Sequence, residues 1–450
     1  MSNKLLKFKL ISLWSLLVFI PLFSRTLIQI DETRYVSVAW EMWIHSNWLV
    51  PYLNGEVYHH KPPLLFWLIN LTWAIFGVND WSPRLISGCF SLASLWLLVY
   101  LARQLWPQDS EIAESAPFIL LACLLWSLFS TVAMFDIMLA FFTLLGMVAI
   151  VKNSWLLLGI AIGLGVLTKG PVILLHLLPV AILASSWNRW YLGVILGAAI
   201  ALAWAIPAAI YGGDEFREAI FWGQTANRIV NSFAHQHPIW WYLPLLPIIL
   251  FPWLFWKPVW QALLQIPQHI SDYGVRFCLI WFLVVFVAFS LISGKQPHYL
   301  LPIIPAFALL IAYLVKQKDK IIIISTVSIL ISIILPLSFI KATEPSYDVR
   351  NISSKIHELQ MNGETIAHLG KYHGQYQFLG RLQQPLEVVT EYNMCSWLIK
   401  NPQGKLVIYL GKEHLSLKQY TDYMQKYRSK KVAIIDASFL YSGCLVPIVF

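Results

Sequence analysis

The sequence predicts a mainly α-helical protein that crosses a membrane many times and ends in a small extracytoplasmic α/β domain. Hydrophobic residues make up 58% of the 450 and charged residues only 12%, whereas soluble domains carry roughly 25% charge. Apolar segments follow one another from residue 10 to residue 340, while the last segment, 341–450, has ordinary polarity. The 22 tryptophans and 19 tyrosines also suit a protein with many lipid–water boundaries.

About eleven apolar segments approach the ~17–25 residues that a membrane-spanning helix needs. They are expected near 10–30, 84–105, 115–133, 137–151, 154–168, 171–186, 190–211, 239–256, 277–293, 299–315 and 321–340. Three lysines precede the first segment, as in a signal peptide, but the apolar run then reaches Pro21, Phe23 and Arg25 instead of a cleavage signal. We therefore expect the first segment to remain as a span.

The distribution of basic residues predicts which ends of the spans face the cytoplasm. With the N-terminus inside, the inner loops and span ends contain eleven Lys or Arg and five Asp or Glu, whereas the outer loops before residue 341 contain eight and nine. This asymmetry agrees with the positive-inside rule. We expect one transmembrane domain over 1–340, with long outer loops at 31–83 and 212–238, and an α/β domain over 341–450 that also lies outside.

The C-terminal segment is expected to contain buried strands at KLVIYLG (405–411) and KVAIIDASFLY (431–441). The polar run 412–430 between them is expected to be helical. Cys395 and Cys444 both fall on the outer side and would pair in an oxidising compartment. Two separate thiols are the alternative, because the sequence does not set the distance between them.

The stretch from Asp31 to Leu65 places charged and turn-forming residues directly beside a span. A carboxylate such as Asp31 at the mouth of a membrane cavity can accept or position the proton of an attacking hydroxyl. Glu32 fits a solvated loop as well as it fits a functional role. Arg34, next to Tyr35, can bind a phosphate or pair with a neighbouring acid.

Isolated charges mark other span ends on the same side. Lys61 precedes two prolines and can bind a lipid phosphate at a helix start, or place its ammonium at the interface as many lysines do. Asp136 is the only charge between Glu114 and Lys152. A lone carboxylate there is costly without a use, so we expect it to face the same cavity as Asp31.

Three further basic residues complete the candidate set. Interfacial snorkelling is the simpler explanation of Lys169 in LTKGP. Lys295 in GKQPHYLLP stands beside a histidine and Tyr299, which favours a ligand contact. Arg228 lies among aromatic residues in the loop 212–238, a composition that suits an acceptor or a lipid head group.

These motifs together carry a family resemblance. DETRY, KPPL, Asp136, LTKGP, HPIWWYLP and GKQPHYLLPIIP occur in the same order as in the polyprenyl-phosphate-dependent membrane glycosyltransferases. The chain most resembles the aminoarabinose transferases that modify lipid A, and more distantly the protein O-mannosyltransferases. The resemblance covers about residues 10–315 and implies the GT-C architecture.

The resemblance implies an inverting glycosyltransferase of the bacterial inner membrane with its active site on the periplasmic side. It would move aminoarabinose or a related sugar from undecaprenyl phosphate to lipid A, another glycolipid or a protein. By motif, Asp31 matches the catalytic first-loop aspartate and Asp136 the second acidic position. Lys61 and Arg228 match residues that hold the carrier phosphate, and Arg34, Tyr35, Lys295 and Tyr299 match further cavity positions, with Lys169 in the LTKGP motif beside them.

Two departures from the family pattern affect the metal and the sugar. His60 stands where the aminoarabinose transferases typically show a glutamate, and Gly223-Gln224 stands where they show a Glu-His pair. A divalent metal and a different sugar both stay open. The alternative function is a transporter or flippase of a lipid-linked sugar, although such proteins usually show repeated halves and mid-membrane charges. Membrane lipids are expected partners and nucleic acids are not.

Overall fold

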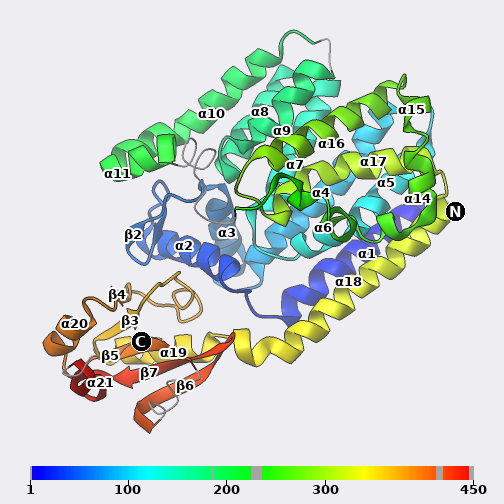
Figure 1. Cartoon of the computed structure of the whole chain (residues 1–450). Coiled ribbons are helices and arrows are strands. Elements are labelled where there is room, and N and C mark those ends of the chain that lie inside the picture. Colours follow the sequence, from blue (N-terminus) through cyan, green and yellow to red (C-terminus); the bar gives the residue numbers. More distant parts are fainter. Residues whose placement is uncertain (1–2, 185–186, 224–235, 412–418, 445–450) are drawn as a thin grey trace. The chain divides into compact units, whose positions relative to one another are not determined.

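The computed structural model describes residues 3–184, 187–223, 236–411 and 419–444. The chain forms two compact units, one made of Met1–Ser24 with His59–Leu337 and the other of Arg25–Tyr58 with Ser338–Phe450 (Figure 1). We call the first the membrane unit and the second the α/β unit, and describe each by itself. The first outer loop therefore divides at Tyr58, and its N-terminal part belongs with the C-terminal segment.

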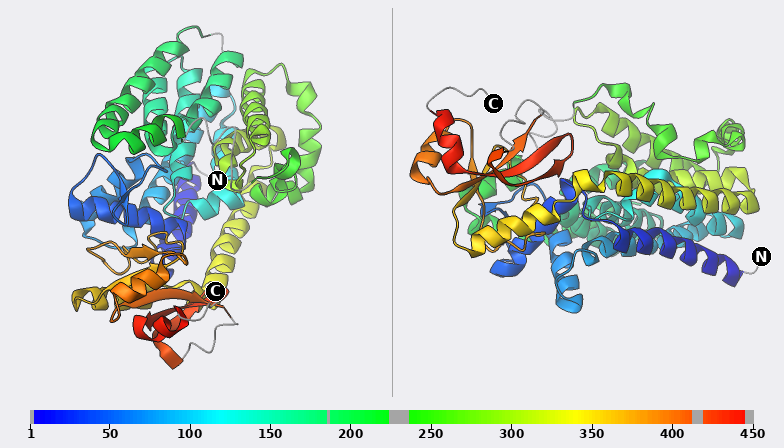
Figure 2. Two further views of the ribbon diagram at one scale, coloured as in Figure 1. Left: turned by 60° about the vertical axis from the view of Figure 1, so that its left-hand side comes forward. Right: turned by 90° about the horizontal axis from the view of Figure 1, so that it is seen from below.

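Six helices in the described residues are long and apolar enough to cross a bilayer. They cover Lys4–Ser24, Ser82–Leu105, Trp190–Tyr211, Tyr273–Leu291, Pro297–Val315 and Lys318–Thr343. The chain is a multi-pass membrane protein, and the long helices of the membrane unit share roughly one direction (Figure 2).

The membrane unit contains the following elements, in chain order. They are α1 (Asn3–Ser24), α3 (Leu64–Phe76), α4 (Ser82–Leu105), α5 (Ser110–Ala122), α6 (Leu124–Phe129), α7 (Phe135–Val151), α8 (Trp155–Lys169), α9 (Val172–Leu183), α10 (Trp190–Tyr211), α11 (Gly213–Glu218), η1 (Ala219–Gly223), η2 (Ile239–Tyr242), α13 (Leu246–Ile249), η3 (Trp253–Phe255), α14 (Lys257–Leu263), α15 (Ile266–His269), α16 (Tyr273–Leu291), η4 (Pro297–Ile303), α17 (Ile304–Val315) and most of α18 (Lys318–Tyr347).

The expected span 115–133 is not one continuous helix. It breaks at Cys123, whose backbone is extended (φ −60°, ψ 124°), between α5 and α6. Carbonyl groups near the break accept bonds from other side chains: the Trp253 indole donates to Ile119 at 3.0 Å, and the Ser328 hydroxyl donates to Ala122 at 3.1 Å. Such partners make a broken helix tolerable inside a membrane protein.

The expected span 239–256 is also wrong as a single helix. The structure instead forms the short elements η2, α13 and η3 in succession. Four prolines lie between residues 238 and 252. Each proline lacks the N–H that a helix interior needs, so repeated prolines prevent a regular helix despite the high hydrophobicity.

Glycines allow α8 and α10 to pack closely against each other, and the two helices are neighbours in Figure 1. Gly159 and Gly163 on α8, and Gly193 and Gly197 on α10, each face a side chain of the other helix. A Cβ atom at Gly163 would lie 2.6 Å from Cβ of Ile200. Small residues four apart on both helices are the pattern that allows close helix packing in membranes. This contact fixes the position of α8, whose last residue is Lys169.

The C-terminal part of the α/β unit is a five-stranded mixed sheet with helices on both faces. The strands are β3 (Ile366–Leu369), β4 (Glu387–Val389), β5 (Lys405–Leu410), β6 (Thr421–Tyr427) and β7 (Lys430–Asp436), in the order β4-β3-β5-β7-β6. The pairs β3–β4 and β3–β5 are parallel, whereas β5–β7 and β6–β7 are antiparallel. This arrangement confirms the expected small α/β fold.

Alternate residues of the central strands face two separate hydrophobic cores. Val407, Val432 and Ile434 pack with α19 (Arg350–Met361) on one face. Leu406 and Ile435 pack on the other face with α20 (Met394–Lys400) and α21 (Ala437–Cys444). The period-two alternation of a strand accounts for this division.

The prediction of a helix over 412–430 is wrong for residues 419–430, the part of this run that the structure describes. Residues Thr421–Tyr427 form strand β6, which pairs with β7 through a two-residue turn at Arg428 and Ser429. Arg428 has φ 54°, a left-handed value typical of such hairpins. Pairing with a buried neighbour strand outweighs the local polarity of the run.

Residues Arg25–Tyr58 contribute α2 (Asp31–His45) and a hairpin of β1 (Tyr52–Leu53) and β2 (Glu56–Val57) to the α/β unit. Asn54 and Gly55 form the turn of this hairpin, with φ of 57° and 77°. The Asn54 side chain accepts a bond from the Leu386 N–H at 2.8 Å and donates to the Leu386 carbonyl at 2.8 Å. The Trp40 indole donates to the Leu382 carbonyl at 2.9 Å.

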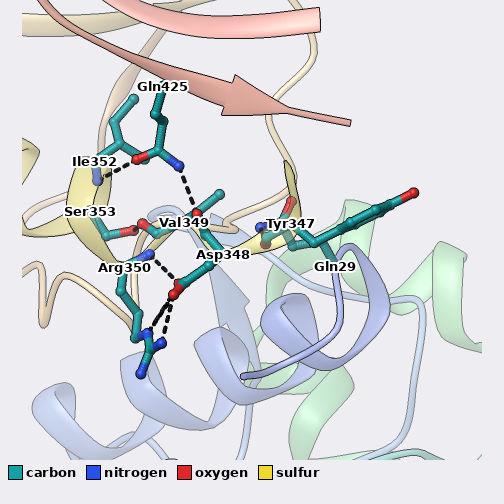
Figure 3. A network of polar contacts seen from close by, with 8 residues as sticks. All are labelled: Gln29, Tyr347, Asp348, Val349, Arg350, Ile352, Ser353 and Gln425. Atoms are coloured by element: carbon teal, nitrogen blue, oxygen red, sulfur yellow. Dashed lines mark hydrogen bonds and ion pairs between the residues drawn. The ribbon is translucent and has the colours of Figure 1, made fainter. Parts of the chain in front are cut away.

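A second polar network joins the end of α18 to the sheet (Figure 3). The Gln425 side chain on β6 donates to the Asp348 carbonyl at 2.6 Å and accepts from the Ile352 N–H at 3.1 Å. The Gln29 side chain donates to the Tyr347 carbonyl from the first-loop side. Backbone groups that the chain leaves unpaired between α18 and α19 are satisfied in this way.

Candidate functional site

Asp136 is buried among partly buried charged and aromatic side chains within the membrane unit. Its carboxylate forms an ion pair with Lys169, and His298 Nε2 lies 4.0 Å from Asp136 Oδ1. Lys169 Nζ lies 4.6 Å from the centre of the Tyr299 ring, and Lys61 Nζ lies 5.7 Å from the centre of the Phe135 ring. We call Lys61, Asp136, Lys169, His298 and Tyr299 the Asp136 cluster.

Helix ends place the two central members of this cluster. Asp136 is in the first turn of α7, and Lys169 is the last residue of α8, which ends at Gly170 with φ 80°. A carboxylate is favoured at a helix N-terminus and a cation at a C-terminus because each offsets the helix dipole. The Asp136 side chain is only 3% exposed and that of Lys169 only 10%, so water screens the attraction between them weakly.

The Asp136 cluster carries more positive than negative charge. Lys61 and Lys169 outnumber the single carboxylate, and both lysines and His298 act electrostatically on Asp136. An excess of partly buried cations around one buried acid is suited to binding an anion such as a phosphate. The explanation of Lys169 by snorkelling does not hold, because its ammonium turns inward to Asp136.

Lys295 occupies a different setting from the one that we expected. It is almost fully buried, and its ammonium donates to the carbonyl of His237 at 2.9 Å and to that of Ile292. These bonds hold the loop after α16 against the start of η2. A ligand contact of Lys295 stays a prediction, and Arg228 lies outside the described residues.

In the α/β unit, Asp31 and Arg34 form an ion pair on the first turns of α2. The Asp31 side chain is 52% exposed, and that of Arg34 is 24% exposed. Arg34 also lies 3.5 Å from the Tyr35 hydroxyl. Burial raises the pKa of Tyr35 far above its ordinary value, so its hydroxyl remains protonated and can donate a hydrogen bond.

Glu32 has a structural role that its sequence position left open. It is buried, accepts a bond from Arg25 at 3.0 Å and accepts the Ile28 N–H at 2.7 Å. These contacts fix the chain before α2. Asp31, the carboxylate that immediately precedes it in the sequence, is the one that remains accessible.

The described residues contain no group of three or more His, Cys, Asp or Glu side chains that could hold a metal ion. His59 and His60 lie beside each other, with ring centroids 4.5 Å apart. His237 instead stacks on Trp241 at 4.1 Å. His235 and Gln224 lie outside the described residues.

Sequence reasoning missed the pairing of Asp136 with Lys169. A signal for it was present, because each is a lone charge and the two stand at the same side of the consecutive helices α7 and α8. Two isolated opposite charges on neighbouring membrane helices are expected to pair. The position of His298 near Asp136 could have been expected in the same way, because His298 lies on η4 and η4 packs against α7.

Comparison of the sequence with protein families gives one family model. The dolichyl-phosphate-mannose-protein mannosyltransferase family matches residues 60–211. An undecaprenyl phosphate-α-4-amino-4-deoxy-L-arabinose arabinosyl transferase of Pseudomonas fluorescens is 32% identical over 329 residues, which cover 67% of this chain and 56% of the relative. A second one, of Proteus mirabilis, is 31% identical over 331 residues, which cover 67% of this chain and 58% of the relative. The match therefore spans less than three-fifths of these relatives' length.

Two solved structures show the same fold. ArnT from Cupriavidus metallidurans, crystallised with undecaprenyl phosphate, superposes with a TM-score of 0.79 at 16% identity, over 96% of this chain and 97% of that one. An oligosaccharyltransferase of Archaeoglobus fulgidus superposes with a TM-score of 0.53 at 13% identity, over 94% and 73%. The agreement with ArnT over nearly the whole chain establishes the GT-C fold.

Proposed function

We propose that this chain, a member of the polyprenyl-phosphate-dependent membrane glycosyltransferases, moves a sugar from undecaprenyl phosphate to an acceptor with inversion. The sugar is 4-amino-4-deoxy-arabinose or a related one, and the acceptor is lipid A or another glycolipid. The names of the curated relatives support this choice of donor and sugar.

The single observation that carries the proposal is the positively charged Asp136 cluster in the membrane unit. Transfer from a polyprenyl phosphate releases a phosphate, whose developing negative charge requires cations nearby. Lys61 and Lys169 would supply these cations, with Arg228 as a third. Asp136 holds Lys169 in place through their ion pair.

The proposed reaction is one displacement at the anomeric carbon. A bond forms from the acceptor oxygen to that carbon as the bond from the carbon to the phosphate oxygen breaks, which inverts the configuration. When the acceptor is a hydroxyl, the exposed carboxylate of Asp31 accepts its proton. When the acceptor is a phosphate, it is already nucleophilic and Asp31, with Arg34 and Tyr35, orients it.

We further propose that the protein lies in the bacterial inner membrane with the α/β unit in the periplasm. The excess of basic residues in the expected inner loops supports this orientation. Cys395 is disulfide-bonded, and disulfides persist in oxidising compartments such as the periplasm. Cys89, Cys123 and Cys278, all in the membrane unit, are free.

The test is sugar transfer by purified full-length protein in lipid nanodiscs. The donor is radiolabelled aminoarabinose on undecaprenyl phosphate, and the acceptors are a hydroxyl-terminated and a phosphorylated lipid. Asp31→Asn should lower transfer to the hydroxyl by about 10²–10⁴-fold and transfer to the phosphate by less. Glu56→Gln, which removes an exposed acid of the same loop, should leave both rates unchanged.

Each other outcome has a definite meaning. Absence of transfer by the wild-type protein from this donor, with movement of the labelled lipid between leaflets, would identify a flippase and overturn the proposal. Undiminished transfer by Asp31→Asn would exclude Asp31 as the base.

A further inference from the structure

Segment 370–378 of the α/β unit lies directly against α2. The Ser37 hydroxyl donates to the Gly374 carbonyl at 2.7 Å and accepts the Phe378 N–H at 3.2 Å. Gly374 has φ 72°, and a Cβ atom there would lie 2.4 Å from Cδ1 of Leu53. Glycine is required both for this backbone conformation and for this approach. His373, the residue before Gly374, is therefore held beside α2, on which Ser37 lies three residues after Arg34.

The surroundings of His373 carry an excess of positive charge. Arg34, Lys371 and Arg428 act on His373 electrostatically, and Asp31 is the opposing acid. Partial burial lowers the pKa of the His373 imidazole, and these three cations lower it further, whereas Asp31 raises it. A site with this balance attracts an anion.

Arg34 has a hydrogen-bond donor to offer such an anion. One terminal nitrogen serves both Asp31 and Tyr35. Its Nε is buried and has no hydrogen-bond partner among the residues that the structure describes. A buried donor without a partner is costly, and a guanidinium binds phosphate oxygens through several donors at once.

We propose that Arg34, Lys371 and His373 form a binding site for the phosphate monoester of the acceptor's head group. This inference rests on the proposed glycosyl transfer and deepens it, because it assigns recognition of a phosphorylated acceptor to the α/β unit. A phosphate monoester carries nearly two negative charges and three acceptor oxygens, which match the excess of cations and the free donor. Arg428, on the β6–β7 turn, adds to the attraction at longer range.

The kinetic test separates the acceptor from the carrier as the source of the phosphate. Transfer by the full chain in nanodiscs is measured for Lys371→Gln and His373→Gln, with an acceptor lipid bearing a phosphate monoester and with the same lipid dephosphorylated. Each variant should raise KM for the phosphorylated lipid about fivefold, which is ~1 kcal/mol. The KM for the donor and for the dephosphorylated lipid should not change.

Lys400→Gln is the matched control, because it removes an exposed lysine of the same unit from the opposite face of the sheet. An unchanged KM for the phosphorylated lipid in both test variants would overturn the proposal. A rise in the donor's KM alone would assign the phosphate to the carrier and would also overturn it.

A binding test does not depend on catalysis. The full chain labelled with ¹³C-histidine is titrated with glucosamine 1-phosphate, and the His373 signal is assigned by its loss in His373→Gln. Bound phosphate should raise the pKa of His373, because it offsets the surrounding cations, and the rise should shrink in Lys371→Gln. A constant pKa at millimolar ligand would overturn the site. If the ligand raises the pKa of His373 but the protein transfers no sugar, the phosphate site would be supported and the transferase function would be rejected.

Discussion

Adjacent carboxylates of α2 have different roles because of their direction on the helix. Asp31 and Glu32 are neighbours in sequence, yet successive side chains of an α-helix diverge by about 100°. Glu32 therefore turns into the unit, where Arg25 neutralises it, while Asp31 remains accessible beside Arg34. The sequence favoured Asp31 as the functional acid and left Glu32 open, and the structure leaves the Asp31 carboxylate accessible while Glu32 is buried.

Asp136 and Lys169 form a buried pair whose members depend on each other. Asp136→Asn or Lys169→Gln alone leaves a buried charge with less compensation, and we expect each to cost about 3–5 kcal/mol of stability. The double variant should cost clearly less than the sum of the two. Thermal unfolding of the purified protein in detergent measures this coupling.

The exposed pair Lys355 and Glu358, 2.9 Å apart on α19, serves as the control cycle. Its coupling should be at most about 1 kcal/mol because solvent screens exposed pairs. Additive effects of the Asp136 and Lys169 substitutions would contradict the ion pair.

At the scale of elements, the positions of glycines determine how closely two membrane helices pack, which hydropathy does not predict. The apolar runs of α8 and α10 predict two helices, but the four-residue spacing of their glycines determines how closely they approach. That approach sets where α8 ends and hence where Lys169 lies. The proposed role of the cluster therefore depends on an apolar contact between two helices.

Gly163→Val should therefore disturb the membrane unit. A Cβ atom there already meets Cβ of Ile200 at 2.6 Å, and overpacking of this kind costs about 1–3 kcal/mol. We expect a lower unfolding temperature in detergent and slower sugar transfer, since Lys169 shifts with α8. Ile160→Val, on an exposed part of the same helix, should change stability by no more than ~0.5 kcal/mol.

Strand β6 shows the opposite relation between an element and its sequence. Its residues are polar and alternate irregularly, and the local pattern favoured a helix. The paired strand β7 provides a full ladder of partners, and the left-handed turn at Arg428 directs the chain back along it. Tertiary pairing overrides local propensity at this edge of the sheet.

At the scale of the whole chain, the α/β unit is built from two distant parts of the sequence. The first-loop segment Arg25–Tyr58 packs with Ser338–Phe450 through bonds such as that of Ser37 to Gly374. The proposed base Asp31 and the proposed phosphate-binding residues Lys371 and His373 therefore belong to one folded unit.

The disulfide of Cys395 provides a test of orientation in cells. With the α/β unit in the periplasm, Cys395 should react with maleimide in the acid-quenched, denatured full chain only after reduction. Cys395→Ser should lower the stability of the α/β unit by about 2–4 kcal/mol. The free residue Cys89 is the control and should react without reductant. Reaction of Cys395 before reduction would place the unit in a reducing compartment.

The sequence by itself determined the membrane class, the order of the apolar segments, the lone charges and two buried strands of the C-terminal domain. The second strand was expected over 431–441, but β7 ends at Asp436 and the chain continues as the helix α21. These features are local, since hydropathy, helix length and alternation can be evaluated over short windows. Only the tertiary structure decided that Lys169 pairs with Asp136, that Glu32 is buried while Asp31 is exposed, and that 370–378 packs on α2. The ion pair and the 370–378 contact depend on packing between residues far apart in sequence, whereas the burial of Glu32 depends on how α2 is oriented in its unit. Neither packing nor orientation can be evaluated from hydropathy over a short window.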